Sequence, residues 1–238
     1  MISFFDVGLV LLVYIIVIFI IIISEYFRKK LQLSSRVTRQ AIHLFSGDNM
    51  LLLPFFSALI YPLTIPIGLA LLTLYSFHSR KKSIMSRTMI VDEYDKYHAY
   101  GPLYYILSIM ILLIIAWNIR HIAMAAVMIM AWGDGAASVL GPRFKKRHLY
   151  PNSSKSLEGS IAMFIFAMFG ASLAMIIALQ SGLIVSSITI LLIISFMGAL
   201  IGTISEGCSI GPLKPFDNFT VPFSAAAVMY IFSSFMQI

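Results

Sequence analysis

Long apolar stretches alternate with short polar segments along the whole chain. An apolar helix of about 20 residues is long enough to cross the hydrocarbon core of a bilayer. Apolar periodicity and turn residues predict eight such helices. Their expected spans are 4–24, 41–59, 63–78, 102–118, 122–140, 159–179, 183–204 and 219–236. The predicted fold class is all-α, a polytopic integral membrane protein with one helical transmembrane domain over residues 1–238.

The second and third spans have the least regular pattern. Pro54, Pro62 and Pro66 interrupt this region, and the polar pair Asp48 and Asn49 lies within it. A re-entrant hairpin is therefore an alternative to two full spans, because irregular backbone at membrane depth is tolerated where protein surrounds it.

The composition excludes an ordinary soluble protein. The chain has 238 residues, of which 60% are hydrophobic and 11% charged, with a mean hydropathy of +0.93. Soluble domains are about 45–50% apolar and about 25% charged. The first apolar segment is too long for a cleaved signal peptide and its basic residues follow it, which indicates a first span with its N-terminus outside. The lone Cys208 excludes an intramolecular disulfide and a cysteine-based metal site.

The basic residues predict the orientation of the helices. With the N-terminus outside, the segments 25–40, 79–101, 141–158 and 205–218 fall on one face of the membrane. They contain all but one of the 17 Lys and Arg residues, the exception being Arg120. The positive-inside rule assigns that face to the cytoplasm and leaves both termini outside. The net charge of +7 is thus explained by orientation and anionic lipids, without nucleic acid as a partner.

Three polar runs fall on the predicted cytoplasmic face, at 131–137, at 154–159 and at 205–207 with 217–220. Carboxylates, a lysine and glycines around helix ends suit a metal-bound nucleotide phosphate. In the first run, Asp134 stands between Gly133 and Gly135, which permit close approach of a phosphate. An intramembrane carboxylate is costly unless it pairs or binds a cation. The structural alternative is an ion pair with the basic run that follows Gly141, which includes Arg143 and Lys145.

The second run precedes the sixth predicted helix. Lys155 and Ser156 stand just before Glu158 and Gly159, and helix N-termini bind anions through free N–H groups. We expect phosphate contact here, and an ordinary cap by Ser154 is compatible with it. The run is not a P-loop, because the chain has no GxxxxGK[ST] motif.

The third run supplies further oxygen ligands. Asp134, Glu206, Asp217 and Asn218 together predict a Mg²⁺ site, since that cation prefers carboxylate and amide oxygens. The alternative for Asp217 is the N-cap of the last helix.

A fourth group lies in the second predicted helix. Arg39, His43 and Gly47 are spaced four apart and share one stripe of a helix. The stripe suits phosphate binding or acid–base chemistry, and the alternative for His43 is a packing role.

At these residues the chain resembles the CTP-dependent lipid-alcohol kinases, such as dolichol and phytol kinases, and more distantly the phosphatidate cytidylyltransferases. The resemblance rests on Arg39-Gln40-Ala41-Ile42-His43 with Gly47, Gly133-Asp134-Gly135-Ala136-Ala137 with Gly141, Lys155-Ser156-Leu157-Glu158-Gly159-Ser160, and Glu206 with Asp217-Asn218-Phe219-Thr220-Val221-Pro222. Many members of the family have Lys where this chain has Gln40. The resemblance implies a many-helix membrane fold, CTP as phosphoryl donor, Mg²⁺ and an isoprenoid alcohol as acceptor.

The predicted function is transfer of the γ-phosphate of CTP to the hydroxyl of a polyprenol, dolichol, phytol or geranylgeraniol type of alcohol. The predicted catalytic residues are Asp134, Lys155, His43 and Arg39, and the predicted metal ligands are Asp134, Glu206, Asp217 and Asn218. The predicted nucleotide-binding residues are Gly133, Gly135, Gly141, Arg143, Lys145, Lys155, Ser156, Glu158 and Gly159. A cytidylyltransferase that makes a CDP-lipid is the enzymatic alternative. A non-enzymatic lipid transporter is disfavoured, because the charges gather at one face rather than along a path across the bilayer.

Overall fold

The chain is divided into two compact units, Met1–Ile115 and Ala116–Ile238. The computed structural model describes residues 3–32, 35–78, 100–151, 153, 155–209 and 216–237, without the side chains of 35–37, 39, 77 and 78. The basic predicted loop at 79–101 therefore lies almost wholly outside the described residues, as do Ser154 and Lys214. Each unit is described by itself below, and the prediction of one domain over the whole chain stays a prediction.

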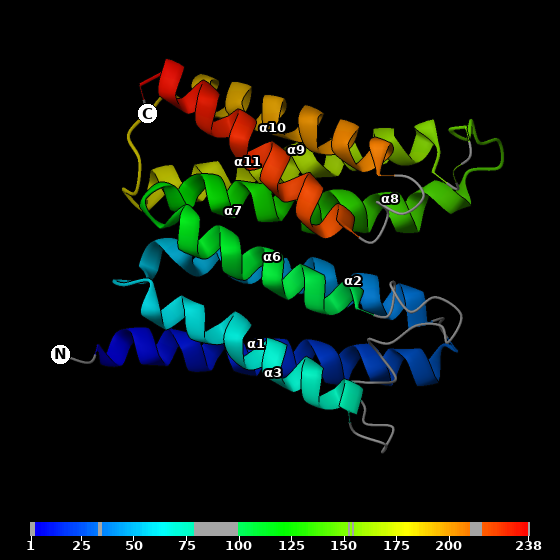
Figure 1. The fold of residues 1–238 in the computed structure, drawn as a ribbon, viewed down its shortest axis with the longest axis horizontal. Coiled ribbons are helices and arrows are strands. Elements are labelled where there is room, and N and C mark those ends of the chain that lie inside the picture. Colours follow the sequence, from blue (N-terminus) through cyan, green and yellow to red (C-terminus); the bar gives the residue numbers. More distant parts are fainter. Residues whose placement is uncertain are drawn as a thin grey trace. The chain divides into compact units, whose positions relative to one another are not determined.

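Unit 1 consists of helices in the part that the structure describes. Its elements are α1 (Phe4–Lys30), α2 (Ser35–Gly47), the 3₁₀ helix η1 (Asp48–Phe55), α3 (Ile60–His78) and α6 (Gly101–Ile115). Helix α1 packs against α2 and α3, and α3 packs against α6 (Figure 1). Nearly every position of α1, α3 and α6 is apolar, so these helices have no polar face to turn to solvent. Their apolar side chains explain why they pack against other helices.

Polar contacts join α1 to the turn before α3 and to α3 itself. The buried carboxylate of Asp6 accepts hydrogen bonds from the main-chain N–H and the hydroxyl of Ser57, at 2.8 and 2.7 Å. Further along α1, the Tyr14 hydroxyl donates to the carbonyl of Thr64 at 2.8 Å. A Cβ at Gly68 would stand 2.2 Å from that hydroxyl, so the glycine makes room for the contact.

The second predicted span differs from a single helix over 41–59. Helix α2 begins at Ser35, and the chain tightens into η1 at Asp48. The Asn49 side chain donates to the carbonyl of Ser46 at 3.2 Å, and Pro54 lies inside η1. Local side-chain bonds compete with the α-helical ladder and proline cannot donate to it, which explains why the α-helix stops here.

Unit 2 is arranged around one long segment, Trp117–Arg143. The segment joins η2 (Trp117–Ile119), α7 (Arg120–Met128), the π-helix η3 (Ile129–Asp134), α8 (Gly135–Leu140) and the 3₁₀ turn η4 (Gly141–Arg143). Around it pack α9 (Leu157–Gln180), α10 (Ile188–Cys208) and α11 (Asp217–Phe235) (Figure 1). Burial identifies the long segment as the core helix: 72% of its apolar window is buried, against 28–44% in the three helices around it.

Small residues let these helices approach closely, as is typical of helices packed in membranes. A Cβ at Gly170 of α9 would lie 3.2 Å from the carbonyl oxygen of Met128. A Cβ at Gly202 of α10 would lie 2.7 Å from the Cγ2 of Ile129. The core segment therefore lies close to the main chain of α9 at Gly170 and to the main chain of α10 at Gly202.

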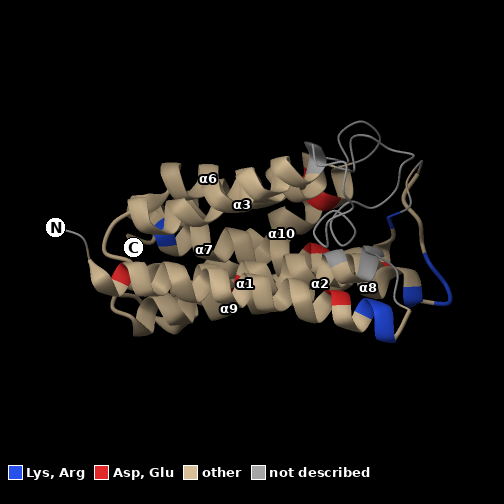
Figure 2. Cartoon of the chain, turned by 90° about the horizontal axis from the view of Figure 1, so that it is seen from below, with Lys and Arg blue, Asp and Glu red and all other residues tan. Residues whose placement is uncertain are grey.

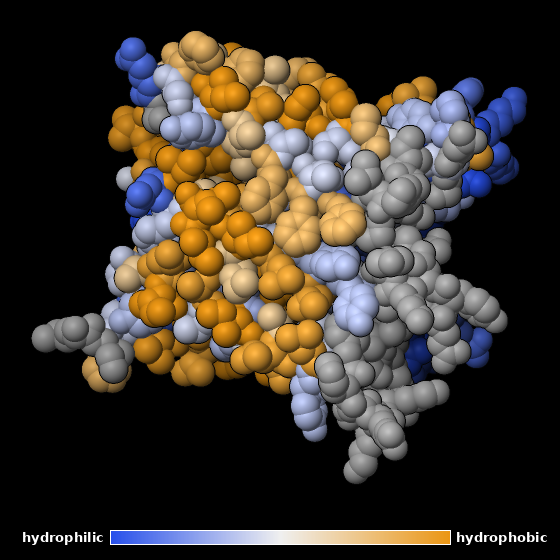
Figure 3. Space-filling view, viewed as in Figure 1, coloured by the Kyte–Doolittle hydropathy of each residue, from blue (hydrophilic) through white to orange (hydrophobic). Residues whose placement is uncertain are grey.

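Within the described residues, five helices are long and apolar enough to cross a membrane, and two shorter apolar helices accompany them. Large apolar side chains cover much of the visible surface (Figure 3). Charged residues gather at helix ends, for example in the last turn of α1 and in the loop that follows α8 (Figure 2). The predicted all-α polytopic membrane fold is thus confirmed, while the count of eight spans and the sides of the termini remain predictions.

Candidate active site

Four helix ends meet at one end of unit 2. The close contact of Gly141 and Gly159 joins the end of α8 and η4 to the start of α9. The pair of Lys155 and Glu206 joins the start of α9 to the end of α10. A hydrogen bond from α10 to Thr220 adds the first turn of α11. The second and third polar runs of the sequence therefore share one location.

Asp134 is the last residue of the π-helical stretch in the core segment. Its side chain is half-buried, whereas the residues before it from His121 to Ala131 are buried. A π-helical turn widens the helix by one residue and is frequent at functional sites. The π-helical stretch ends at Asp134, whose carboxylate is the one charged side chain of this turn.

The loop between η4 and α9 is folded back on the start of α9. Leu149 and Ser156 form an antiparallel bridge, and Ser156 caps α9 by accepting from the Gly159 N–H at 3.2 Å. The Glu158 carboxylate accepts from the main-chain N–H of His148 at 3.0 Å and contacts its Nδ1 at 2.6 Å. The N-cap of α9 is therefore Ser156 rather than Ser154. The Glu158 carboxylate binds the preceding loop through His148.

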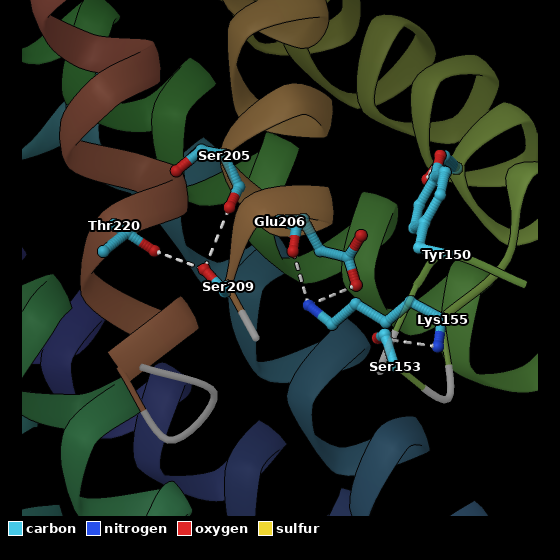
Figure 4. A network of polar contacts seen from close by, with 8 residues as sticks. Tyr150, Ser153, Lys155, Ser205, Glu206, Ser209 and Thr220 are labelled. Atoms are coloured by element: carbon cyan, nitrogen blue, oxygen red, sulfur yellow. Dashed lines mark hydrogen bonds and ion pairs between the residues drawn. The ribbon is translucent and has the colours of Figure 1, made fainter. Parts of the chain in front are cut away.

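Lys155 and Glu206 form an ion pair that is largely withdrawn from solvent (Figure 4). The Lys155 Nζ lies 2.8 Å from the Glu206 Oε1 and 2.5 Å from its main-chain oxygen. The two side chains are 12% and 8% exposed. The lysine therefore supplies a cation to the C-terminus of α10, where helix carbonyls lack partners and the dipole is negative.

Two further polar contacts lie near the ends of the same helices (Figure 4). The Tyr150 hydroxyl donates to the Ser160 hydroxyl at 2.9 Å, and a Cβ on Gly207 would lie 3.6 Å from the Tyr150 ring. The hydroxyl of Ser209 donates to the Ser205 carbonyl at 2.9 Å and lies 3.1 Å from the hydroxyl of Thr220. The contacts of Lys155 and of Thr220 therefore join the start of α9 and the first turn of α11 to the end of α10.

The glycines predicted to bind nucleotide have a packing role in the structure. A Cβ on Gly141 would lie 3.3 Å from the Gly159 Cα, and a Cβ on Gly133 would lie 3.1 Å from side chains of Met163 and Ala167 on α9. Gly135 is buried as well. Their small size brings the Asp134 turn and the start of α9 together. Arg143 is the last residue of η4 and Lys145 lies in the loop that follows, and both are exposed.

The residues predicted to bind metal are only partly brought together. Among the described residues, no three His, Cys, Asp or Glu side chains are close enough to hold one metal ion. Glu206 is instead paired with Lys155. Asp217 and Asn218 begin α11 and are half-buried, and the N-cap of that helix is Phe216 rather than Asp217. Mg²⁺ on a nucleotide needs only one or two protein carboxylates beside phosphates and water. The carboxylates of Asp134 and Asp217 are donors of that type, while the carboxylate of Glu206 is paired with Lys155.

Arg39 and His43 belong to α2 of unit 1, together with Gly47. The side chain of Arg39 lies outside the described part. The His43 ring stacks on Tyr105 with 4.0 Å between ring centroids, and the Tyr105 hydroxyl donates to the His43 carbonyl at 2.9 Å. The packing role considered for His43 is therefore present, and a chemical role stays a prediction.

Three features of the site were not predicted from the sequence. The ion pair joins residues 51 positions apart, so no local pattern marks it. The role of His148 depends on a loop that folds back over ten residues. The π-helical turn at 129–134 lies in a mostly apolar stretch whose pattern does not differ from that of an α-helix. The glycines on both sides of Asp134 are the one feature of the sequence that indicates irregular backbone there.

Three plant proteins match parts of the chain. Farnesol kinase, chloroplastic, of Arabidopsis thaliana is 36% identical over 135 residues, which cover 55% of this chain and 42% of that protein. Phytol kinase 1, chloroplastic, of the same species is 38% identical over 69 residues, covering 29% and 23%. The probable phytol kinase, chloroplastic, of Triticum aestivum is 40% identical over 65 residues, covering 27% and 22%. Over these parts, the chain is similar to proteins named as kinases of phytol and farnesol.

The matched segments span less than half the length of these lipid-alcohol kinases. No family model and no solved structure matches the chain. The resemblance seen in the sequence motifs is confirmed, and the names of the relatives indicate phosphorylation of phytol and farnesol by those proteins.

Proposed function

We propose that this protein is a membrane-embedded kinase that transfers the γ-phosphate of CTP to the hydroxyl of an isoprenoid alcohol. The observation that carries the proposal is the similarity to proteins named phytol kinase and farnesol kinase. The polar network at one end of unit 2 supports it, because phosphoryl transfer depends mainly on positioning and charge neutralisation.

Lys155 is the proposed phosphate-binding cation. An ammonium group has three N–H donors, and its contacts with the carboxylate and the carbonyl of Glu206 use two of them. The third can donate to a phosphate oxygen while the lysine stays fixed to α10. The positive end of the α9 dipole, next to Lys155, would add to the attraction for an anion.

Asp134 is the proposed central carboxylate, with Asp217 and Asn218 as neighbours in the same unit. Mg²⁺, when bound with the nucleotide, would supply charge neutralisation for the phosphates. The carboxylates of Asp134 and Asp217 would hold it, and the Gly133–Gly135 backbone would let the phosphates come close. Arg143 and Lys145, which are both exposed, would attract the nucleotide over a longer range. We place this end of unit 2 at the cytoplasmic face, in line with the distribution of basic residues.

The donor and the metal can be tested together. Detergent-purified protein is incubated with farnesol or phytol and with γ-labelled CTP or γ-labelled ATP, in Mg²⁺ or in excess EDTA. We expect label in the lipid phase from CTP in Mg²⁺, with a much smaller signal from ATP and none in EDTA. Equal transfer from ATP would contradict the choice of CTP, and transfer in EDTA would contradict the metal.

A further inference from the structure

Unit 1 contains an elongated apolar cavity that the phosphate chemistry does not use. It encloses about 830 Å³ of space, its open mouth included. All four helices of the unit and η1 contribute to its wall. The residues contributed by α6 extend from Pro102 to Leu113, about 16 Å along the axis at 1.5 Å per residue. This length suits a chain rather than a compact ligand.

The wall of this cavity is apolar except along one stripe. His43, Ser46 and Asn49 follow one another at a spacing of three residues on α2 and η1. The remaining wall residues are aliphatic or aromatic side chains and prolines, such as Val17, Ile65 and Phe56. Among the described residues, no Lys, Arg, Asp or Glu side chain lines the cavity. An apolar ligand with one neutral hydrogen-bonding group therefore fits better than a lipid with a charged headgroup.

The polar stripe is held in place by its surroundings. The His43 ring is stacked on Tyr105, whose hydroxyl is bonded to the His43 carbonyl. The side-chain amide of Asn49 donates to the main-chain carbonyl of Ser46, and this bond orients the Asn49 side chain. The contact of Asp6 with Ser57 joins α1 to the turn before α3, and the contact of Tyr14 with Thr64 joins α1 to α3. The cavity is therefore bounded by a fixed frame rather than by loosely packed helices.

We infer that this cavity binds the hydrocarbon chain of an isoprenoid alcohol, with the alcohol hydroxyl at the stripe of His43, Ser46 and Asn49. The inference rests on the proposed function for its choice of an isoprenoid alcohol as the occupant. The apolar wall, the elongated form and the uncharged polar stripe are independent of that function. The acyl chain of a membrane phospholipid is the competing occupant, and the described wall residues offer its headgroup no charged partner.

Photo-crosslinking tests the assignment without requiring catalysis. A geranylgeraniol analogue with a diazirine at the far end of its chain is bound to the reconstituted protein, irradiated, and its adducts are mapped by mass spectrometry. We expect adducts on cavity residues of α1, α3 and α6, competed by geranylgeraniol and not by phosphatidylcholine. Adducts only on lipid-exposed residues or on unit 2 would overturn the inference, and equal competition by phosphatidylcholine would assign the cavity to acyl chains.

Matched substitutions on one helix sharpen the test. Val17 lines the cavity, whereas its neighbour Ile18 is 55% exposed on the outer surface of the unit. Val17→Phe should lower the yield of cavity adducts about tenfold, while Ile18→Phe leaves it unchanged. On α3, Ile65→Phe and Ile67→Phe repeat the comparison, because Ile65 lines the cavity and Ile67 is exposed. Equal effects within both pairs would contradict the assignment even if one variant folds poorly.

The same material separates this inference from the proposed function. If the wild-type protein transfers phosphate to no alcohol and the cavity adduct persists, the kinase proposal fails and the cavity assignment stands. If phosphate transfer to geranylgeraniol proceeds and cavity residues carry no adduct, the kinase proposal stands and the cavity assignment is overturned.

Discussion

The ammonium of Lys155 is held by two oxygens of one residue, the carboxylate and the main-chain carbonyl of Glu206. Both side chains are nearly buried, so removal of one leaves an unpaired charge in a poorly solvated place. Such a loss is far more costly than the loss of an exposed ion pair. The pair therefore has a structural role whether or not Lys155 also binds phosphate.

A double-mutant cycle separates these two roles of Lys155. Lys155→Met alone should destabilise the protein by about 3–5 kcal/mol, because Glu206 remains charged and unpaired. Lys155→Met with Glu206→Gln should recover most of that stability and still lack activity. Thermal unfolding in detergent and phosphate transfer are the measurements. Full activity in the stable double variant would remove Lys155 from phosphate binding.

Asp134→Asn tests the proposed central carboxylate. The amide has nearly the same shape and no negative charge, so the half-buried side chain should still fit the π-helical turn. We expect phosphate transfer to fall by at least about a hundredfold with an unchanged thermal midpoint. Asp92→Asn, in the predicted loop at 79–101, is the matched control and should retain activity. Near-normal activity of the Asp134 variant would exclude that residue from the mechanism.

At the scale of the helices, the core segment depends on glycines at its contacts. Gly202→Ala places a methyl group 2.7 Å from the branched side chain of Ile129, which is buried and cannot swing aside. Overpacking of this kind costs about 1–3 kcal/mol. We expect a lower thermal midpoint for Gly202→Ala.

The matched control lies on α1, where a Cβ on Gly8 would meet nothing within 4 Å. Gly8→Ala should be neutral or stabilising by up to about 1 kcal/mol, since alanine favours the helix. A loss of stability for both variants would mean that alanine itself, rather than crowding, is responsible.

The helices themselves could be predicted well from the sequence, since apolar length sets the spans. Helix α9 covers Leu157–Gln180 against a predicted 159–179, and α11 covers Asp217–Phe235 against 219–236. The prediction was poorest at Asp48, where a 3₁₀ helix replaces the expected α-helix. That change depends on a few local hydrogen bonds and a proline, which hydrophobic periodicity does not report.

The location of the site could be predicted, and the partners of its residues could not. Lys155, Glu206 and Glu158 were all identified as polar residues at helix ends. Their bonds to one another and to His148 depend on which helix ends meet in space. Spacing along the sequence predicts a phosphate ligand at Lys155 and a metal ligand at Glu206, but it does not predict that the two residues pair with each other.

For the molecule as a whole, the predicted topology places the end of α10 in the cytoplasm. Cys208 lies there, is exposed, and is the one cysteine of the chain. A membrane-impermeant maleimide should label it in inside-out vesicles and not in sealed right-side-out vesicles. In a Cys208→Ser background, Val185→Cys should show the opposite pattern, because Val185 is 91% exposed in the loop before α10. Labelling of both cysteines from one side would contradict the topology.

The central claim is that the γ-phosphate of CTP passes to an isoprenoid alcohol. The most direct measurement uses purified protein with Mg²⁺, a panel of isoprenoid alcohols and phosphatidate, and CTP labelled on either the α or the γ phosphorus. The account predicts label in the lipid phase only from γ-labelled CTP and only with an alcohol. Label from α-labelled CTP on phosphatidate would identify a cytidylyltransferase instead, and no transfer from either label would contradict the kinase assignment for these substrates.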